Sequence, residues 1–230
     1  MKLSVVVPCY NEEKNIPLIL ERFGQLIKRD DIEVILVNNG STDGSAKVLE
    51  ELLPKYPFAK TTLVTVNQGY GYGILQGLKE CSGEYIGWTH ADMQTDPKDI
   101  LKALHIIEKV KMPVYVKGNR KGRPFFDTFF TMGMSLFETC YLHKPLYDIN
   151  AQPNLFPKTF YENWKNPPYD FSLDLYALYM ARVKGLKVIR FPVLFPERIH
   201  GESKWNTGLC AKWKFIKRTI AFSVELKKKI

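Results

Sequence analysis

The sequence predicts an α/β protein with a mainly parallel central sheet and helices on both of its faces. Short apolar runs rich in β-branched residues alternate, over the first 120 residues, with segments whose apolar residues recur at helical spacing. Within the runs, apolar residues do not alternate with polar ones, which is typical of parallel strands buried on both faces. Ordered strand–helix repeats of this kind predict parallel β/α units.

The first half of the chain supplies the regular part of this pattern. The opening run LSVVVP (3–8) is a continuous apolar strand, and the segment 11–29 after it carries Ile16, Leu20 and Phe23 on one helical stripe. The same reasoning predicts further strands at 33–39, 61–67, 84–89 and 113–120, and further helices at 41–53, 71–80 and 97–110.

The second half is less regular. We expect helices at 125–142, which is aromatic-rich with only two charges, at 170–185, and from residue 208 onward. A strand is expected at 186–195, and a strand followed by a turn within 148–161. Because no repeat or linker is visible, we expect one domain over 1–206, with 207–230 as a basic amphipathic helix packed on it or extending from it.

The net charge of +9 over 230 residues is concentrated in two regions. Residues 196–230 contain nine Lys or Arg and three Glu, and residues 109–123 contain six Lys or Arg and no acid. Such clusters suit phosphates, whereas a solvated helix face is the alternative for any single lysine. No basic recognition helix or aromatic–basic RNA motif is present, so nucleic acid is not an expected partner.

The cysteines predict the cellular compartment of the protein, and the apolar runs predict whether it spans a membrane. Four scattered cysteines indicate neither a zinc site nor a disulfide framework, which favours a reducing compartment. The first apolar run is too short for a signal peptide, and no run is long enough to span a bilayer. We expect a cytoplasmic protein, and leave open a peripheral position on the cytoplasmic face of a membrane.

Polar residues gather directly after three of the predicted strands. They occupy residues 8–12, 38–45 and 90–94. Ligands of parallel α/β sheets bind at the carboxyl ends of the strands. The convergence of these three clusters predicts the functional site at that edge. The chain contains neither a P-loop nor a GxGxxG fingerprint, which argues against those two nucleotide sites.

Asp92 and Gln94 are the candidate metal ligands within the third cluster. Carboxylate and amide oxygens suit Mg²⁺ or Mn²⁺, and two residues this close in sequence can meet at one ion if the backbone turns between them. The alternative is an Asx-type turn ahead of the helix that starts at Pro97, with Asp96 as its N-cap. Three cations, Arg120, Arg198 and Lys204, are expected near the same edge, where they would stabilise a departing diphosphate.

The motifs SVVVPCYNEEKNIP, LVNNGSTDGS, D-x-Q, GNR and ERIHGESKW follow one another over about residues 3–205. This series resembles family two of the inverting, nucleotide-sugar-dependent glycosyltransferases, which have the GT-A fold. Within that family it looks most like the dolichyl- or polyprenyl-phosphate mannose and glucose synthases. The resemblance implies a nucleotide-sugar pocket with a divalent cation, Mg²⁺ or Mn²⁺, held by Asp92 and Gln94. It implies phosphate contacts by Arg120, Arg198 and Lys204, and nucleotide-sugar contacts by Pro8, Tyr10, Glu12, Asn39, Gly40, His90 and Asp92.

The chain departs from the family pattern in three places. Asn38-Asn39 stands where the family usually has two aspartates, which can change the preferred base. His90 replaces the first carboxylate of the usual Asp-x-Asp motif, so we expect weaker or altered metal dependence. Residues 148–154 stand where the family usually has a glycine-rich acceptor stretch, which can change the acceptor.

The resemblance implies transfer of a hexose from a nucleotide-diphosphate sugar to a polyprenyl (dolichyl-type) phosphate at the membrane surface. One alternative is a soluble enzyme that extends a saccharide hydroxyl in polysaccharide or glycan synthesis, and another is a non-catalytic sugar-nucleotide-binding protein. A lipid phosphate is already an anion, whereas a hydroxyl must lose a proton to a base. Asp174 falls where hydroxyl-glycosylating members carry that base, although it can equally be an acid at the rim of the site. Asp148 is a weaker candidate.

Overall fold

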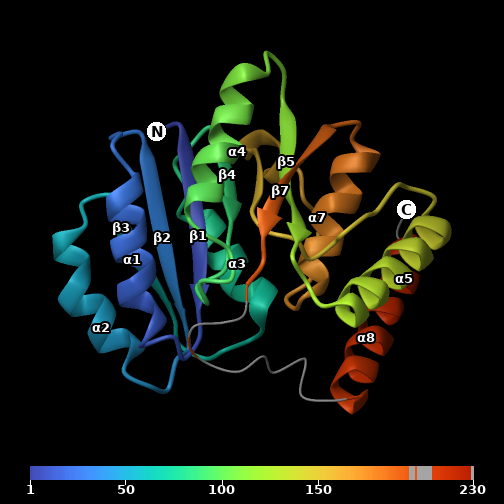
Figure 1. The fold of residues 1–230 in the computed structure, drawn as a ribbon, viewed down its shortest axis with the longest axis horizontal. Helices are drawn as coiled ribbons and strands as arrows, with labels where there is room; N and C mark the ends of the chain where they lie inside the picture. The colour runs from blue at the N-terminus through green and yellow to red at the C-terminus, as the bar shows by residue number, and fades with distance from the viewer. Residues whose placement is uncertain (197–199, 201–208, 229–230) are drawn as a thin grey trace.

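The computed structural model describes residues 1–196, 200 and 209–228. In this part of the chain seven strands form one sheet, in the order β3-β2-β1-β4-β6-β5-β7 (Figure 1). The strands are β1 (Leu3–Cys9), β2 (Ile32–Asn39), β3 (Ala59–Val64), β4 (Tyr85–Trp88), β5 (Val114–Lys121), β6 (Asn154–Pro157) and β7 (Lys187–Leu194). All pairs are parallel except those of β6, which runs antiparallel to β4 and β5. The mainly parallel sheet predicted from sequence is therefore confirmed.

Strand β6 is shorter than the stretch that suggested it, and it lies between two strands that precede it in the sequence. Its neighbours carry glycines where it approaches them most closely. A Cβ atom on Gly87 would lie 1.8 Å from the carbonyl oxygen of Asn154, and one on Gly118 would lie 1.9 Å from that of Gln152. Any side chain at either position would push β6 and the segment before it out of the sheet.

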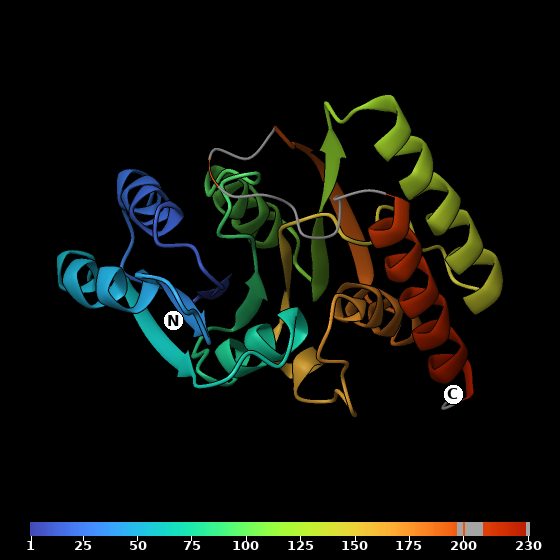
Figure 2. The ribbon, with the colours of Figure 1, turned by 90° about the horizontal axis from the view of Figure 1, so that it is seen from below.

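Helices cover both faces of the sheet (Figures 1 and 2). The side chains of β1 alternate between two cores: Val5 and Val7 pack with α1 and α4, and Val6 packs with α3 and α7. This arrangement explains why the strands are apolar at consecutive positions. The helices are α1 (Asn15–Leu26), α2 (Ser45–Leu52), η1 (Leu53–Lys55), α3 (Tyr70–Lys79), α4 (Lys98–Lys109), α5 (Phe125–Leu142), α6 (Lys158–Tyr161), α7 (Ser172–Val183) and α8 (Leu209–Lys228).

Helices α5 and α8 lie side by side at the β7 end of the sheet (Figures 1 and 2). Lys227 of α8 donates to the carbonyl oxygen of Tyr141 on α5 at 2.8 Å, and Arg218 forms an ion pair of 3.0 Å with Asp170. No helix in the described ranges is long and apolar enough to cross a membrane.

Glu138 of α5 is fully buried against α8. The hydroxyl of Ser223 donates to its Oε2 atom at 2.7 Å, whereas Oε1 has no hydrogen-bond partner among the described residues. A carboxylate placed here loses hydration that one hydrogen bond does not replace. Burial therefore raises the pKa of Glu138 from 4.5 to about 7.

We expect this carboxyl group to make the protein less stable as pH rises. The folded chain holds the proton up to about pH 7, whereas the unfolded chain releases it near pH 4.5, so its contribution to stability is complete below pH 4.5 and is lost between those two values. The total is roughly 3 kcal/mol at about 1.4 kcal/mol per pKa unit. Glu138→Gln keeps the Ser223 contact without an ionisable group and should flatten this part of the curve in urea unfolding from pH 4 to 8. The exposed Glu162→Gln is the control; equal pH slopes for wild type and Glu138→Gln would contradict the prediction.

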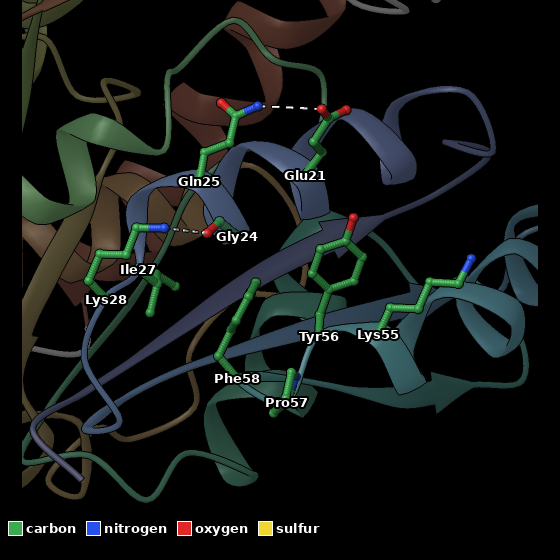
Figure 3. A pocket seen from close by; sticks show the side chains of 9 residues that line it. All are labelled: Glu21, Gly24, Gln25, Ile27, Lys28, Lys55, Tyr56, Pro57 and Phe58. Atoms are coloured by element: carbon green, nitrogen blue, oxygen red, sulfur yellow. Dashed lines mark hydrogen bonds between the residues drawn. The ribbon is translucent and has the colours of Figure 1, made fainter.

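A surface hollow and the polar clusters lie at opposite ends of the sheet. The hollow is shallow and lies at the amino end, between the last turns of α1 and the Tyr56–Phe58 segment (Figure 3). The three polar clusters that follow β1, β2 and β4 lie instead at the carboxyl end, at the lower edge of the sheet in Figure 1, where Cys9 and Asn38 stand opposite each other in register. The hollow of Figure 3 is therefore separate from the site.

Candidate functional site

The loops that follow β1 and β2 are joined by side-chain hydrogen bonds. The backbone N–H of Asn11 donates to Ser41 Oγ at 3.1 Å, and the N–H of Thr42 donates to Asn11 Oδ1 at 2.8 Å. Asn11 has a φ of +58°, a conformation that asparagine tolerates better than most residues. Its short amide side chain thus serves both the backbone bend and the contact between the loops.

The next residues extend this contact. Glu12 N–H donates to Ser45 Oγ at 2.9 Å, Glu13 N–H donates to Asp43 Oδ2 at 3.2 Å, and Gly44 N–H donates to Glu13 Oε2 at 2.8 Å. These hydrogen bonds, made by residues of the NEE and STDGS motifs, therefore hold the ends of β1 and β2 at a fixed separation. Within it Glu12 is half-buried and accepts from Asn15 Nδ2 at 2.6 Å.

Asn39 and Gly40 lie at the end of β2. Asn39 is 3% exposed, donates from Nδ2 to the Gly69 carbonyl at 3.1 Å, and packs against Gly73 of α3. Gly40 has a φ of +71°, and a Cβ atom there would lie 2.5 Å from the backbone nitrogen of Asn67. Only glycine suits this turn. Pro8 and Tyr10, at the end of β1, are half-buried at the same edge.

Asp92 and Gln94 lie in a tight turn after β4. Met93 between them has a φ of +59°, so the backbone does turn at this point. Asp92 is 4% exposed, and its Oδ1 atom accepts the Gln94 N–H at 3.1 Å, which is an Asx-type turn. Gln94 Nε2 donates to the Pro196 carbonyl at 3.0 Å, so the side-chain oxygen is the atom that can act as a ligand. The Asx-type turn involves the Gln94 backbone and leaves the second oxygen of Asp92 and the side-chain oxygen of Gln94 out of this hydrogen bond, so the two interpretations of this motif are compatible.

Two neighbours complete this corner. Asp96 accepts the N–H of Lys98 at 2.9 Å, as expected of a cap at the start of α4, and also pairs with Arg22 at 2.9 Å. The ring of His90 lies 6.0 Å from that of Tyr70, the first residue of α3. His90 therefore faces the α3 side of the site.

Arg120 is paired inside the protein. Its backbone N–H donates to Asp148 Oδ2 at 2.8 Å and its Nε to Oδ1 at 2.9 Å, and both side chains are at most 7% exposed. Burial raises the pKa of Asp148, but the charge and hydrogen bonds of Arg120 outweigh it and hold that pKa below its usual value. Asp148 is thus a counter-ion for Arg120 and is poorly suited to act as a base. The sequence had predicted Arg120 as a cation without identifying this partner.

Asp174 lies inside the protein and not at the rim of the site. It is 1% exposed on the first turn of α7. Its Oδ1 atom accepts from Trp88 Nε1 at 3.2 Å, Gln152 Nε2 at 2.9 Å and Asn154 Nδ2 at 3.0 Å. Burial raises the pKa of Asp174, and the charge of Lys117 opposes that shift. The rim interpretation is corrected here: α7 directs this acid into the interior, toward side chains of β4, β6 and the segment before β6.

The remaining two predicted cations, Arg198 and Lys204, lie outside the described residues, together with most of the ERIHGESKW motif.

The protein-family model described as "Glycosyl transferase family 2" matches residues 4–176, which include both joined loops, the Asp92 turn and Asp174. The chain belongs to glycosyl transferase family 2.

Two curated relatives of this family two chain differ in how much of it they match. A dolichol-phosphate mannosyltransferase of Pyrococcus furiosus is 29% identical over 212 residues, which are 89% of this chain and 59% of the relative. An undecaprenyl-phosphate 4-deoxy-4-formamido-L-arabinose transferase of Pseudomonas fluorescens is 36% identical over 126 residues, 52% of this chain and 36% of the relative. The chain thus spans less than two thirds of the length of either relative.

Solved structures support the predicted fold. Glucosyl-3-phosphoglycerate synthase of Mycobacterium tuberculosis, crystallised with Mn²⁺, UDP and glucosyl-3-phosphoglycerate, superposes with a TM-score of 0.74 at 15% identity. The match covers 97% of this chain and 78% of that one. At this identity the likeness concerns the fold, which is the GT-A fold predicted from the motifs.

The donor atoms at the Asp92 turn fit a magnesium-like ion. Structural neighbours were crystallised with Mn²⁺ or Mg²⁺ together with UDP. Among the described residues, no group of three or more His, Cys, Asp or Glu side chains is arranged to hold a metal. Mg²⁺ commonly takes only one or two carboxylates from a protein, and phosphate and water supply the other ligands. Asp92 and the Gln94 oxygen are donor atoms of this kind.

Sequence reasoning missed four polar residues below this edge: Tyr70, Lys117, Gln152 and Asn154. Lys117 gave a signal, because it interrupts the apolar strand PVYVKGNR at a position where both faces of the sheet are covered. Gln152 and Asn154 lie in the stretch 148–154 that departs from the family pattern, but their roles gave no signal because their partners come from distant parts of the chain, and Tyr70 gave no signal at all.

Proposed function

We propose that this chain transfers a hexose, with inversion, from a nucleotide-diphosphate sugar to a polyprenyl (dolichyl-type) phosphate at a membrane surface. The position of α5 is the observation that supports a lipid phosphate as the acceptor. This helix begins two residues after Arg123, at the carboxyl end of β5, and leads away from the site (Figure 1). A lipid whose phosphate reached the cations could lie with its chain along α5.

The exposed surface of α5 fits such a lipid. Phe125, Phe126 and Phe129 are 77%, 80% and 67% exposed, and Met132 and Leu136 continue the same surface. We call these five residues the apolar stripe. Soluble proteins seldom expose a contiguous apolar surface without a binding role. Lys121 precedes the stripe by four residues, and the exposed Lys227 and Lys228 lie at the other end of α5, where Lys227 contacts Tyr141; these lysines supply positive charge suited to anionic lipid headgroups.

The donor would bind at the carboxyl ends of β1, β2 and β4. Pro8, Tyr10 and Glu12 are proposed to line the nucleotide pocket, with Asn39 and Gly40 at its base side. His90 and Asp92 are proposed to face the sugar diphosphate. A divalent cation on Asp92 and Gln94 would neutralise charge on the departing diphosphate.

The reaction needs one displacement. An oxygen of the acceptor phosphate forms a bond to the anomeric carbon as the bond to the nucleoside diphosphate breaks, which inverts the configuration. Because the phosphate is already ionised near neutral pH, no side chain has to remove a proton. Arg120, with Arg198 and Lys204, is proposed to hold the two phosphate groups in line. The alternative, transfer to a saccharide hydroxyl, needs an accessible base, and the burial of Asp174 disfavours it.

The test supplies radiolabelled UDP-, GDP- and CDP-hexoses with Mn²⁺ and a short-chain polyprenyl phosphate in detergent. We expect label in the solvent-extracted lipid with one donor. Label in an added saccharide, and none in lipid, would favour the soluble alternative. Donor binding without any turnover, including hydrolysis, would favour the non-catalytic one.

A further inference from the structure

Three neighbouring strands carry polar side chains in one row of the sheet, directly beneath the site. Trp88 of β4 stands opposite Asn154 of β6, which stands opposite Lys117 of β5. All three are 0% exposed, and the surrounding side chains include Tyr115 and Phe156. Placing a lysine in such surroundings is costly unless its charge is compensated.

The compensation comes from Asp174 through an asparagine bridge. Lys117 Nζ donates to Asn154 Oδ1 at 2.5 Å and to the Ala151 carbonyl at 2.7 Å. Asn154 Nδ2 in turn donates to Asp174 Oδ1 at 3.0 Å and to Gln152 Oε1 at 2.7 Å. Burial lowers the pKa of Lys117, and the negative charge of Asp174 opposes that shift. One buried cation and one buried anion thus share a single amide.

These bonds fix the segment 148–154, which precedes and enters β6. At its end, Lys117 and Asp174 hold residues 151, 152 and 154. At its start, Asp148 is held by Arg120 and by Ser135, whose hydroxyl accepts the Asp148 N–H at 3.2 Å. Because Asp148 positions Arg120, any shift of the segment moves that guanidinium group.

The same segment reaches the donor side. Gln152 Nε2 donates to the hydroxyl of Tyr70 at 3.2 Å, and the ring of Tyr70 stacks on Phe171 at 4.6 Å. Tyr70 is also the residue next to His90. The buried row therefore connects the residues proposed for the phosphates with those proposed for the sugar.

We propose that Asp174 and Lys117 are positioning residues: as a compensated buried pair they hold the segment 148–154, and through Asp148 the side chain of Arg120, in the geometry that sugar transfer requires. This inference rests on the proposed function, because an anionic acceptor needs an oriented cation and no base. Asp174 accordingly acts through its neighbours and does not touch the acceptor.

The test is a double-mutant cycle of Asp174→Asn and Lys117→Met. Asparagine keeps an acceptor oxygen in the same position, so Asp174→Asn removes charge more than shape. Each single change leaves one buried charge without its partner. We expect each to lower kcat/KM for polyprenyl phosphate about 100-fold, as displaced groups do. The double variant restores compensation and should recover to within about tenfold of wild type.

A general base would behave differently. Asp174→Asn would then abolish kcat and remove the acidic limb of the pH–rate profile, and adding Lys117→Met would recover nothing; that result would overturn the inference. Asp99→Asn is the matched control, because it removes another buried carboxylate paired with a lysine, on α4. It should leave kcat/KM unchanged.

Amide hydrogen exchange separates failure of this inference from failure of the proposed function. If wild type makes no lipid-linked product, the proposed function fails. Exchange in peptides covering 148–154 still reports whether Asp174 and Lys117 hold this segment in place. Faster exchange there in both single variants, and slower exchange again in the double variant, supports the inference. Unchanged protection in both single variants overturns it. If the Asp174→Asn variant does not fold, the amount of folded protein recovered by adding Lys117→Met measures the coupling between Asp174 and Lys117. No recovery would count against the inference.

Discussion

Asp92→Asn should lower the rate of sugar transfer roughly 100- to 1,000-fold, a loss typical of removing one group that stabilises charge in the transition state. Apart from Asp96, which pairs with Arg22, the Asp92 carboxylate is the one negatively charged donor among the described residues of the loop after β4, since His90 replaces the other and Gln94 is neutral. Loss of its charge weakens the hold on the cation while the turn can persist, because an asparagine oxygen also accepts the Gln94 N–H.

The measurement is transfer rate against Mn²⁺ concentration. Asp96→Asn is the matched control in the same loop: its partner is Arg22 and its role is at the start of α4, so metal dependence should not change. His90→Asp adds a carboxylate and should lower the Mn²⁺ concentration needed for half-maximal rate. If Asp92→Asn retained the wild-type Mn²⁺ curve, the assignment of Asp92 as a metal ligand would be wrong.

Replacing three residues of the apolar stripe, Phe126, Phe129 and Leu136, with serine should reduce binding to vesicles roughly 100-fold or more. Fully burying one such side chain contributes about 1.5–3 kcal/mol, and three partly inserted side chains together reach at least 3 kcal/mol. The three side chains are at least 66% exposed, so their loss removes no core packing and the melting temperature should stay close to that of wild type.

The assay is co-sedimentation with vesicles containing anionic lipid. Leu63→Ser with Val66→Ser is the matched control, because these residues are 69% and 67% exposed but belong to β3, at the opposite edge of the sheet, and the loop after it. The control should bind as wild type does. Equal losses for both sets would indicate general hydrophobicity, and no loss for the stripe would remove the support that α5 gives to a lipid acceptor.

Local patterns determined most of the fold in advance. Runs of consecutive apolar residues identified the parallel strands, because a strand covered on both faces has no polar face. The helix at 125–142 was predicted to the residue, and the polar clusters expected after the strands lie at the carboxyl edge of the sheet, with Asn39, Asp92 and Arg120 at or after the ends of β2, β4 and β5. These features depend on neighbours in sequence, or on the rule that parallel strands end at one edge.

Only the tertiary structure decided what those residues contact. The antiparallel insertion of β6 between β4 and β5 places Asn154 beside both Trp88 and Lys117, an arrangement for which no local pattern exists. The same insertion brings Asp148 to Arg120 and places Asn154 against Asp174 on the first turn of α7. A charge in a sequence has no fixed environment: burial and a partner from a distant segment determine whether it binds a substrate or holds another residue in place.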